Sequence, residues 1–378
     1  MEASGTIAAR AETDDMTDLP AHDILDTTED HRRRNARWPY VLVGVFLALG
    51  LLVVVLWPVK VPYYAMAPGP VEEVADLVSV GETGLETFQS EGDLYLLTVG
   101  LREVNVFEYV EAQFDSKVDL IDREVIRPSG VTQEQITRTN LQAMDESIDT
   151  ALFVALARLG YDVGFVGDGV EVLEVVEGSP AEGVLLVGDE ITEVSGISVD
   201  TSDDAAAEIR SFTVGDTITL SGVRSDEPLS VEVTLAPHPD IEGAPMVGVL
   251  FDTINLDLDL PIEVSVDSRN IGGPSAGMMY TLSLIDLLTP EDLTKGHRIA
   301  GTGTIRFDET VGAIGGVRQK VFAARGVGAA YVLVPEANYD DAITAAGDDI
   351  EVVAISALQD AIDFLDALEP APMLVAAG

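Results

Sequence analysis

An uncharged run of 22 residues, from Trp38 to Val59, constrains this chain more than any other feature. It consists mainly of Val, Leu, Gly and Phe, and as a helix it would extend about 33 Å. That length matches the hydrocarbon core of a bilayer, and Trp38 and Trp57 stand where interfacial aromatic residues are expected. The sequence therefore predicts one transmembrane helix over residues 38–59.

The basic residues around this helix predict its orientation. Those that closely precede it are Arg32, Arg33, Arg34 and Arg37. Only Lys60 follows it closely, so by the positive-inside rule the N-terminus stays in the cytoplasm and the later domains lie outside it. We therefore expect a single-pass protein of the cell membrane, with residues 1–37 as a disordered cytoplasmic tail.

A cleaved signal peptide is the alternative to an anchor. Ala65-Met66-Ala67 resembles a cleavage site, but Pro68 directly follows it and would hinder processing. The long charged leader and the long apolar run also favour an uncleaved anchor.

Composition narrows the partners and the chemistry. A net charge of −45 excludes nucleic acid as a partner, because phosphate binding requires a basic surface. The chain has no cysteine, so disulfides, thiolate nucleophiles and zinc–thiolate sites are excluded. It also lacks the G-x-x-x-x-G-K-[ST] loop, and we expect no bound nucleotide, no metal and no cofactor. The acidity fits either a highly soluble surface or a saline habitat.

Changes in residue composition and periodicity divide the rest of the chain into parts. The expected parts are an exit linker with the first part of a mixed α/β domain (60–159), a β-rich domain (160–238), the second part of the α/β domain (239–370) and a tail (371–378). Within the first part we expect a strand over 93–110 and a helix over 132–159. Thr132 and Gln135 resemble a capping box that starts this helix.

The β-rich part, residues 160–238, reads as short strands separated by glycine and aspartate turns. The run V-x-x-G-S-P-A followed by G-D-x-I-x-x-V-x-G resembles a PDZ domain of the bacterial exported type, with another small β-rich module as the alternative. The resemblance implies peptide binding by strand addition along Val170–Val175, with loop Tyr161–Phe165 receiving a terminal carboxylate. The residues expected to contact the peptide are Val163, Gly164, Phe165, Val170 and Val172.

Residues 272–277 read Gly-Gly-Pro-Ser-Ala-Gly and fall between a predicted strand and a predicted helix. Ser275 would then lie at a helix N-terminus, where free N–H groups and the helix dipole stabilise a developing oxyanion. The residues expected to shape this turn and oxyanion site are Gly273, Pro274, Ala276 and Gly277. Because serine is also a favoured N-cap residue, a structural cap is the alternative role for Ser275.

A serine nucleophile requires a base that accepts its proton. The run also fits G-x-S-x-G, but the Ser–Asp–His triad of an esterase would need a histidine well downstream. His297 is the only histidine after Ser275, and it follows by just 22 residues. Lysine is rare in this chain, and Lys320 shares a predicted helix face with Val317 and Val321. If buried, this lysine would lose its charge, because desolvation disfavours the ammonium form, and it could act as a base near neutral pH.

Three motifs together resemble the proteolytic domain of Lon peptidases, namely Gly273-Pro274-Ser275-Ala276-Gly277, Thr302-Gly303 and Gly315-Gly316-x-x-x-Lys320. The resemblance implies a catalytic dyad of Ser275 and Lys320, with Thr302 holding the lysine. It also implies an α+β fold with the PDZ-like domain inserted between two parts of the peptidase, and a ring of six chains. Gly272 departs from the pattern, because many Lon enzymes carry an acid at that position.

Residues 92–95 and 144–148 resemble the opening strand and the first helix of the same domain, which places residues 60–159 in the peptidase. The whole chain resembles the membrane-bound, PDZ-containing Lon-like proteins of Gram-positive bacteria. We therefore expect an ATP-independent serine endopeptidase that acts on extracytoplasmic peptides or loosely folded proteins, with the PDZ domain recruiting substrate or gating the site. The alternative is a catalytically inactive scaffold that only binds peptides at the membrane.

Overall fold

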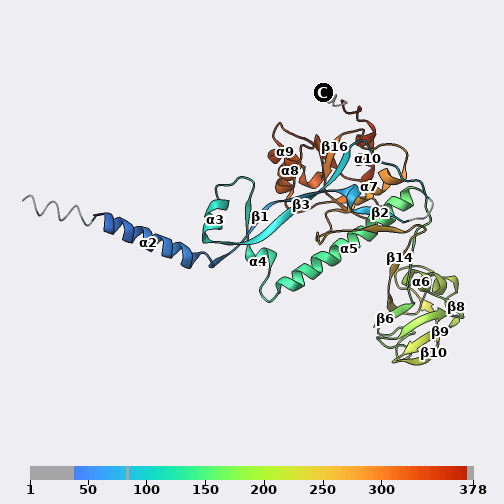
Figure 1. Ribbon diagram of the computed structural model, residues 1–378. Coiled ribbons are helices and arrows are strands. Elements are labelled where there is room, and N and C mark those ends of the chain that lie inside the picture. The colour runs from blue at the N-terminus through green and yellow to red at the C-terminus, as the bar shows by residue number, and fades with distance from the viewer. Residues whose placement is uncertain (1–37, 82–84, 373–378) are drawn as a thin grey trace, which may run out of the picture. The chain divides into compact units, whose positions relative to one another are not determined.

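The computed structural model describes residues 38–81 and 85–372 (Figure 1). The expected cytoplasmic tail, residues 1–37, and residues 373–378 of the expected C-terminal tail lie outside the described residues. The described structure is mixed α+β, with one long apolar helix near the N-terminus, two six-stranded sheets, one mixed and one antiparallel, and four two-stranded sheets.

The described residues form two compact units. The first comprises residues 38–61 and 103–111, and the second comprises residues 62–102 and 112–372. In the first unit, helix α2 (Trp38–Leu56) is 19 residues long, and none of its side chains is buried. By length and composition, it is long and apolar enough to cross a membrane.

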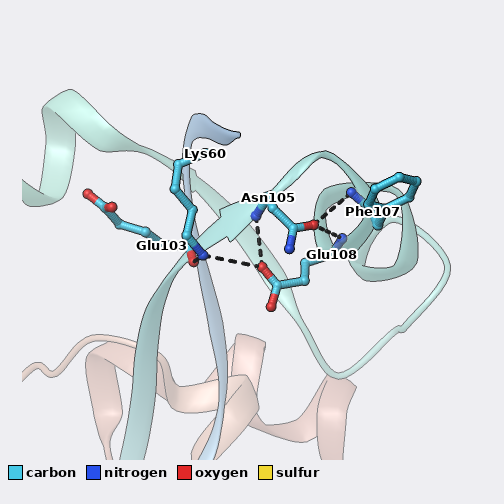
Figure 2. A network of polar contacts seen from close by, with 5 residues as sticks. All are labelled: Lys60, Glu103, Asn105, Phe107 and Glu108. Atoms are coloured by element: carbon cyan, nitrogen blue, oxygen red, sulfur yellow. Dashed lines mark hydrogen bonds and ion pairs between the residues drawn. The ribbon is translucent and has the colours of Figure 1, made fainter. Parts of the chain in front are cut away.

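Two local features set the ends of the elements in the first unit. Helix α2 stops three residues before the predicted Val59, because Pro58 restricts the residue before it and lacks the N–H that would continue the helix. Helix α3 (Val106–Ala112) replaces the end of the strand predicted over 93–110. The side chain of Asn105 accepts hydrogen bonds from the backbone N–H groups of Phe107 and Glu108 (Figure 2), and this cap ends the strand at Asn105.

The second unit contains a six-stranded mixed sheet. Its strands lie in the order β20 (Glu351–Ile355), β19 (Tyr331–Pro335), β16 (Arg298–Gly301), β3 (Asp93–Asn105), β1 (Lys60–Glu73) and β4 (Asp119–Asp122). The pairs β3–β16, β16–β19 and β19–β20 are parallel, whereas β1 and β4 are antiparallel. Consecutive side chains of a strand point to opposite faces, so both faces of this sheet can be covered.

Helices cover both faces of this sheet and form two separate cores. Leu94, Leu96 and Ile299 pack against helices α5 (Gln133–Arg158), α7 (Gly277–Leu288) and α10 (Leu358–Asp366) on one face. Ala300 and Val332 pack against α8 (Val317–Gly326) and α9 (Tyr339–Ala346) on the other. The predicted mixed α/β layers are therefore present.

The start of helix α5 agrees with the sequence prediction. Thr132 accepts a hydrogen bond from the backbone N–H of Gln135, and the Gln135 side chain accepts one from the backbone N–H of Thr132. This reciprocal capping box satisfies two N–H groups at the helix start. Gly160, with a φ of 84°, follows the helix end.

The predicted exit linker is wrong, because residues 60–73 form strand β1 inside the six-stranded sheet. Prolines suggested a linker, since a proline removes an N–H from a strand ladder. Strand β4 pairs with β1 only over Tyr63–Met66, so Pro68 and Pro70 lie beyond its end. Proline is tolerated on a strand edge that has no partner.

The antiparallel sheet of the second unit occupies the predicted β-rich region and extends beyond it. Its strands lie in the order β10 (Glu227–Thr234), β9 (Thr217–Arg224), β7 (Glu190–Val194), β6 (Val170–Val175) and β13 (Val249–Thr253), with β8 (Ile197–Ser198) beside β7. Helix α6 (Ser202–Ser211) starts at a capping box between Thr201 and Asp204. Strand β5 (Gly164–Val166) enters this region and β14 (Asp257–Asp259) leaves it, and the two pair as an antiparallel stem.

Short elements connect these parts. They are η1 (Val74–Asp76), β2 (Val78–Val80), α4 (Arg123–Ile126), β11 (Ala236–Pro237), β12 (Pro245–Met246), β15 (Val264–Val266), β17 (Thr304–Ile305), β18 (Val311–Gly312) and η2 (Glu336–Asn338). Strand β15 pairs with β2 and leads into the loop that carries Ser275.

Candidate active site

Ser275 ends the loop between β15 and α7. The N-cap residue of α7 is Ala276, and it makes no side-chain cap, so the hydroxyl of Ser275 is not used to cap the helix. Gly273 has a φ of 93°, a left-handed conformation that favours glycine and that turns the loop into the helix. The alternative role of Ser275 as a structural cap therefore does not apply.

Helix α5 holds this loop from one side. The backbone N–H of Gly273 donates to the carbonyl of Asn140 at 2.7 Å, and the buried hydroxyl of Ser147 donates to the carbonyl of Pro274 at 3.0 Å. A side chain at Gly272 would collide with Asn140, whose Cβ would lie 2.9 Å from the added Cβ. Contact with α5 explains why Gly272, which departs from the Lon pattern, is a glycine here.

Lys320 reaches Ser275 from the opposite face of the six-stranded sheet. It lies in the first turn of α8, and its side chain is only 2% exposed. Its Nζ is 2.7 Å from the Oγ of Ser275 and 2.8 Å from the Oγ1 of Thr302. The three residues that the Lon resemblance singled out thus lie within hydrogen-bonding distance of one another.

Strand β16 is short, and its end creates the place where these side chains meet. Thr302 directly follows the last strand residue, Gly301, and is fully buried. Its hydroxyl donates to the carbonyl of Ser275 at 3.0 Å, so its lone pairs are free to accept from Lys320. The backbone N–H of Gly303 donates to the same carbonyl at 3.0 Å. Two donors therefore fix the position of Ser275.

Burial lowers the pKa of Lys320 from 10.5 to about 7, because desolvation disfavours the charged ammonium. A large fraction of the amine is therefore neutral near neutral pH. The neutral amine keeps a lone pair that can accept the proton of the Ser275 hydroxyl, while an N–H donates to Thr302. This is the state that a general base needs.

Two backbone donors lie next to the nucleophile. Among the described residues, no acceptor contacts the backbone N–H of Ser275 or of Ala276. Both N–H groups precede the first residue of α7, where the positive end of the helix dipole adds to their effect. They are suited to stabilise a negative oxygen that develops beside Ser275.

A cleft of about 560 Å³ contains this site. Its walls come from strands β1 and β3, from Asn140 and Met144 of α5, from loop 269–276 and from turn 313–315. Most of the side chains are apolar, and no aspartate or glutamate is among the described residues that line the cleft. Its charged side chains are Arg269 and Lys320, in a chain whose net charge is −45.

His297 does not take part in this arrangement. Its Nε2 lies 2.8 Å from the carbonyl of Glu369, and its ring packs edge-on against Tyr331. It is absent from the described residues that line the cleft around Ser275. The geometry thus gives no support to a triad of the esterase type.

The residues predicted to bind a peptide in the β-rich domain do not lie on a free edge of its sheet. Strand β6, with Val170 and Val172, pairs with β7 on one side and with β13 on the other, so it has no edge for strand addition. Val163 packs against the core of the α/β layers, and Gly164 pairs within the stem. Phe165 stacks on Phe153 at a ring distance of 5.3 Å.

The edge strands of this sheet are β10 and β13 instead, and the sequence interpretation placed β13 in the second α/β part. A groove of about 310 Å³ lies beside this strand and helix α6, and its lining includes Ile209, Arg210, Val247 and Phe251. The signal in the sequence was the run Val-Leu-Phe-Asp-Thr over residues 249–253, whose β-branched and aromatic residues continue the strand-like composition past residue 238.

Comparison with known proteins matches two separate parts of the chain to two families. The family model for the PDZ domain matches residues 157–235, and that for the Lon protease (S16) C-terminal proteolytic domain matches residues 254–366. Strand β13 lies between the two matched ranges. Residues 60–156 lie outside both ranges, although β1 and β3 belong to the same sheet as β16, β19 and β20.

Two curated relatives and one solved structure illustrate the similarity. A Lon protease of Magnetococcus marinus is 43% identical over 72 residues, which are 18% of this chain and 9% of that protein. A Lon protease of Campylobacter concisus is 32% identical over 108 residues, 28% of this chain and 13% of that protein. The PDZ domain of an SdrC-like protein from Listeria innocua is 37% identical, with 22% of this chain and 93% of that domain covered and a TM-score of 0.21.

The match covers about a tenth of the length of these curated relatives. The range of the proteolytic family model, residues 254–366, contains both Ser275 and Lys320. The chain therefore carries a PDZ domain and the C-terminal proteolytic domain of Lon proteases, a serine peptidase domain of the Ser–Lys type.

Proposed function

We propose that this chain is a membrane-anchored, ATP-independent serine endopeptidase that cleaves extracytoplasmic peptides or loosely folded proteins. The proposal rests above all on one observation, the 2.7 Å separation between Nζ of Lys320 and Oγ of Ser275 at a lysine that is 2% exposed. A buried amine with a pKa of about 7 and a hydroxyl in contact form a nucleophile and its base.

In the first half of the reaction, Ser275 attacks the carbonyl carbon of the scissile peptide bond. Its hydroxyl proton passes to the lone pair of Lys320 as the new C–O bond forms, and the carbonyl electron pair moves onto oxygen. The N–H groups of Ser275 and Ala276 stabilise that oxyanion. The C–N bond then breaks, Lys320 returns its proton to the leaving amine, and an acyl ester of Ser275 remains.

In the second half, a water molecule replaces the amine. Neutral Lys320 takes a proton from the water as its oxygen attacks the ester carbonyl, and the same N–H groups stabilise the second oxyanion. The bond to Ser275 breaks, and Lys320 returns the proton to the serine oxygen. Thr302 keeps the amine in position during both halves through its hydrogen bond of 2.8 Å.

Strand β3 offers a place for the substrate backbone. Strand β16 pairs with Asp93–Leu96, so residues 97–101 of β3 lie beyond its end, and all of them except Gly100 line the cleft. An extended peptide beside this edge could form ladder hydrogen bonds with β3, which suits segments without stable secondary structure. The apolar walls favour apolar side chains next to the scissile bond.

Three further features support the cellular setting of the proposal. The exposed apolar helix α2 and the arginines before it favour a single anchor with the catalytic domain outside the cytoplasm. The printed sequence has no G-x-x-x-x-G-K-[ST] loop, which favours cleavage without ATP. The Lon resemblance implies a ring of six chains, and we extend that assembly to this protein.

We further propose that the PDZ domain, inserted between the two parts of the peptidase, recruits substrates through the groove between β13 and α6. The edge of β13 away from β6 has no strand partner among the described residues. Ile209, Val247 and Phe251 favour an apolar residue, and Arg210 favours a carboxylate nearby. This groove replaces Val170–Val175 as the expected site of strand addition.

A fluorophosphonate probe and casein hydrolysis test the function on the full chain in detergent micelles. Wild-type protein should react with the probe and degrade casein without ATP, whereas Ser275→Ala and Lys320→Ala should do neither. Lys295→Ala is the matched lysine control, because Lys295 does not line the cleft, and it should keep both activities.

The same experiment separates the rival functions. If the wild-type chain does not react with the probe and does not degrade casein, but still binds peptides, it is the inactive scaffold. Loss of turnover in His297→Ala with activity retained in Lys320→Ala would indicate an esterase of the triad type.

A further inference from the structure

Within the first unit, a small cluster of contacts joins the residues after helix α2 to helix α3 and to the end of β3. The ring centroids of Trp57, the residue after α2, and Phe107 of α3 lie 6.1 Å apart. Nζ of Lys60 donates to the carbonyl of Glu103 at 3.0 Å and lies 3.6 Å from Oε2 of Glu108 (Figure 2). Helix α3 is therefore held to the end of α2 by an aromatic contact and by a lysine.

The polar groups of this cluster satisfy one another. The carboxylate of Glu108 accepts from the backbone N–H of Asn105 at 2.8 Å, while the side chain of Asn105 accepts from the backbone N–H of Glu108. The same carboxylate faces the ammonium of Lys60. One acid thus caps the helix and neutralises the lysine, and both charges are used within the cluster (Figure 2).

Unlike the polar groups, the apolar side chains at this place are exposed to solvent. Trp57 is 61% exposed and Val110 is 50% exposed. Val110 follows Phe107 by three residues, so both lie on the same side of α3. A tryptophan and a valine are therefore exposed where an apolar helix with no buried side chain ends.

We propose that α3 is a second membrane contact, in which Phe107 and Val110 lie with Trp57 in the interfacial layer of the bilayer that α2 crosses. This inference rests on the proposed membrane anchor. The 19 residues of α2 span about 29 Å, close to the thickness of the hydrocarbon core, so Trp57 falls at its boundary. Aromatic residues are favoured at that depth, and the ring contact brings Phe107 to the same level.

The chemistry of the contact specifies which lipid property matters. Glu108 neutralises Lys60, and the exposed Glu111 adds a negative charge, so α3 offers no basic surface for anionic headgroups. The attraction comes from apolar area removed from water. The contact should therefore form in purely zwitterionic bilayers, and anionic lipid should not strengthen it.

The absence of cysteine allows a direct measurement, because each introduced cysteine is the only site for a thiol label. The full chain is reconstituted in phosphatidylcholine vesicles as Val110→Cys, Leu49→Cys or Val187→Cys, each carrying an environment-sensitive fluorophore. Leu49 lies in α2, and Val187 is an exposed valine of the PDZ domain, 68% exposed. Lipids that carry a spin label at the headgroup, or deep in the acyl chain, then quench each fluorophore according to its depth in the bilayer.

We expect a blue-shifted emission at position 110 that headgroup spin labels quench strongly in phosphatidylcholine alone, and that anionic lipid does not enhance. Position 49 should respond to the acyl-chain label, and position 187 should match free fluorophore in water. If position 49 is quenched while position 110 matches position 187, the anchor stands and the α3 contact is overturned. If position 49 also matches water, the anchor itself fails, and the α3 contact fails with it.

A second variant guards against a label that disturbs α3. Unlabelled Phe107→Ser should make Val110→Cys more accessible to a water-soluble maleimide in vesicles, while Leu49→Cys stays protected. Neither Phe107 nor Val110 lines the catalytic cleft, so both variants should still hydrolyse casein. Equal maleimide rates at position 110 with and without Phe107→Ser would contradict the proposal.

Discussion

The amine of Lys320 lies 2.8 Å from the hydroxyl of Thr302, and both side chains are buried. Because the Thr302 hydroxyl donates to the carbonyl of Ser275, it turns its lone pairs toward the lysine. One threonine thereby connects the base to the backbone of the nucleophile. The dyad is thus a three-residue arrangement whose geometry can be tested at Thr302 alone.

Thr302→Val keeps the shape of this side chain and removes its hydroxyl. We expect kcat for casein-derived peptides to fall about 10-fold to 100-fold, because the lysine loses its orientation. Loss of an acceptor also disfavours the ammonium, so the acid limb of the pH profile should move to lower pH. Thr302→Ser should restore most of the rate, and equal activity of Val and Ser variants would contradict the role of the hydroxyl.

The pH dependence of turnover should report Lys320. Its pKa is about 7, so the amine is mainly protonated below that pH and mainly neutral above it. We expect kcat/KM to rise through pH 7 and then to level off, because only the neutral amine accepts a proton. Lys320→Arg should be inactive across the range, since guanidinium keeps its proton. An acid limb near pH 4 would assign the base to a carboxylate instead.

Stability should show the cost of burying this lysine. The folded pKa of about 7 lies below the ordinary 10.5, so the unfolded chain binds more protons between these values. The destabilisation is complete below pH 7 and fades as pH rises toward 10.5. At 1.36 kcal/mol per pKa unit it reaches at most roughly 5 kcal/mol.

Lys320→Met should therefore raise the unfolding temperature clearly at pH 6 and only slightly at pH 10. Thermal unfolding of the full chain in detergent, followed by circular dichroism, measures both values. Lys295→Met, at a lysine outside the cleft, is the control and should change neither. A gain that is equal at both pH values would show that burial of charge is not the cause.

The hydroxyl of Ser147 is expected to position the nucleophile loop. It is buried and donates to the carbonyl of Pro274 at 3.0 Å. Ser147→Ala removes this bond and should cost about 1 kcal/mol of stability, with a drop in kcat rather than a rise in KM. Thr150→Ala removes a helix-internal bond of the exposed face of α5 and serves as the control. Unchanged kcat with lower stability would leave Ser147 a purely structural role.

The groove beside β13 predicts where a peptide binds to the PDZ domain. Ala206→Arg should fill the groove and abolish binding of a fluorescent peptide with an apolar C-terminus, measured by anisotropy. Leu173→Lys changes an exposed side chain of β6 and should leave the affinity unaltered. The opposite pattern would return the binding edge to Val170–Val175.

Much of the site could be predicted from the sequence because its chemistry is local or rare. The glycines around Ser275 predict a turn into a helix, and a lysine is conspicuous among only four in the chain. The capping box of Thr132 and Gln135 predicts the start of α5 for the same reason, since capping depends on residues three apart.

The predictions that were wrong concern features that depend on pairing between segments far apart in the sequence. Nothing local in Pro68 and Pro70 shows that β1 lies beside β3, and so the prolines predicted a linker. Likewise, β6 has no free edge only because β13, more than 70 residues later, pairs with it. The contacts of Asn140 and Ser147 with the nucleophile loop were not foreseen for the same reason.

The stem of β5 and β14 has a mechanical consequence. The two connections to the PDZ domain pair along Gly164–Val166 and Asp257–Asp259. The domain is therefore joined to the α/β layers by a two-stranded ribbon rather than by two independent linkers. Phe165 of this stem also stacks on Phe153 of the α/β layers, so a one-residue shift in the register of the stem would turn that ring to the opposite face and break the contact.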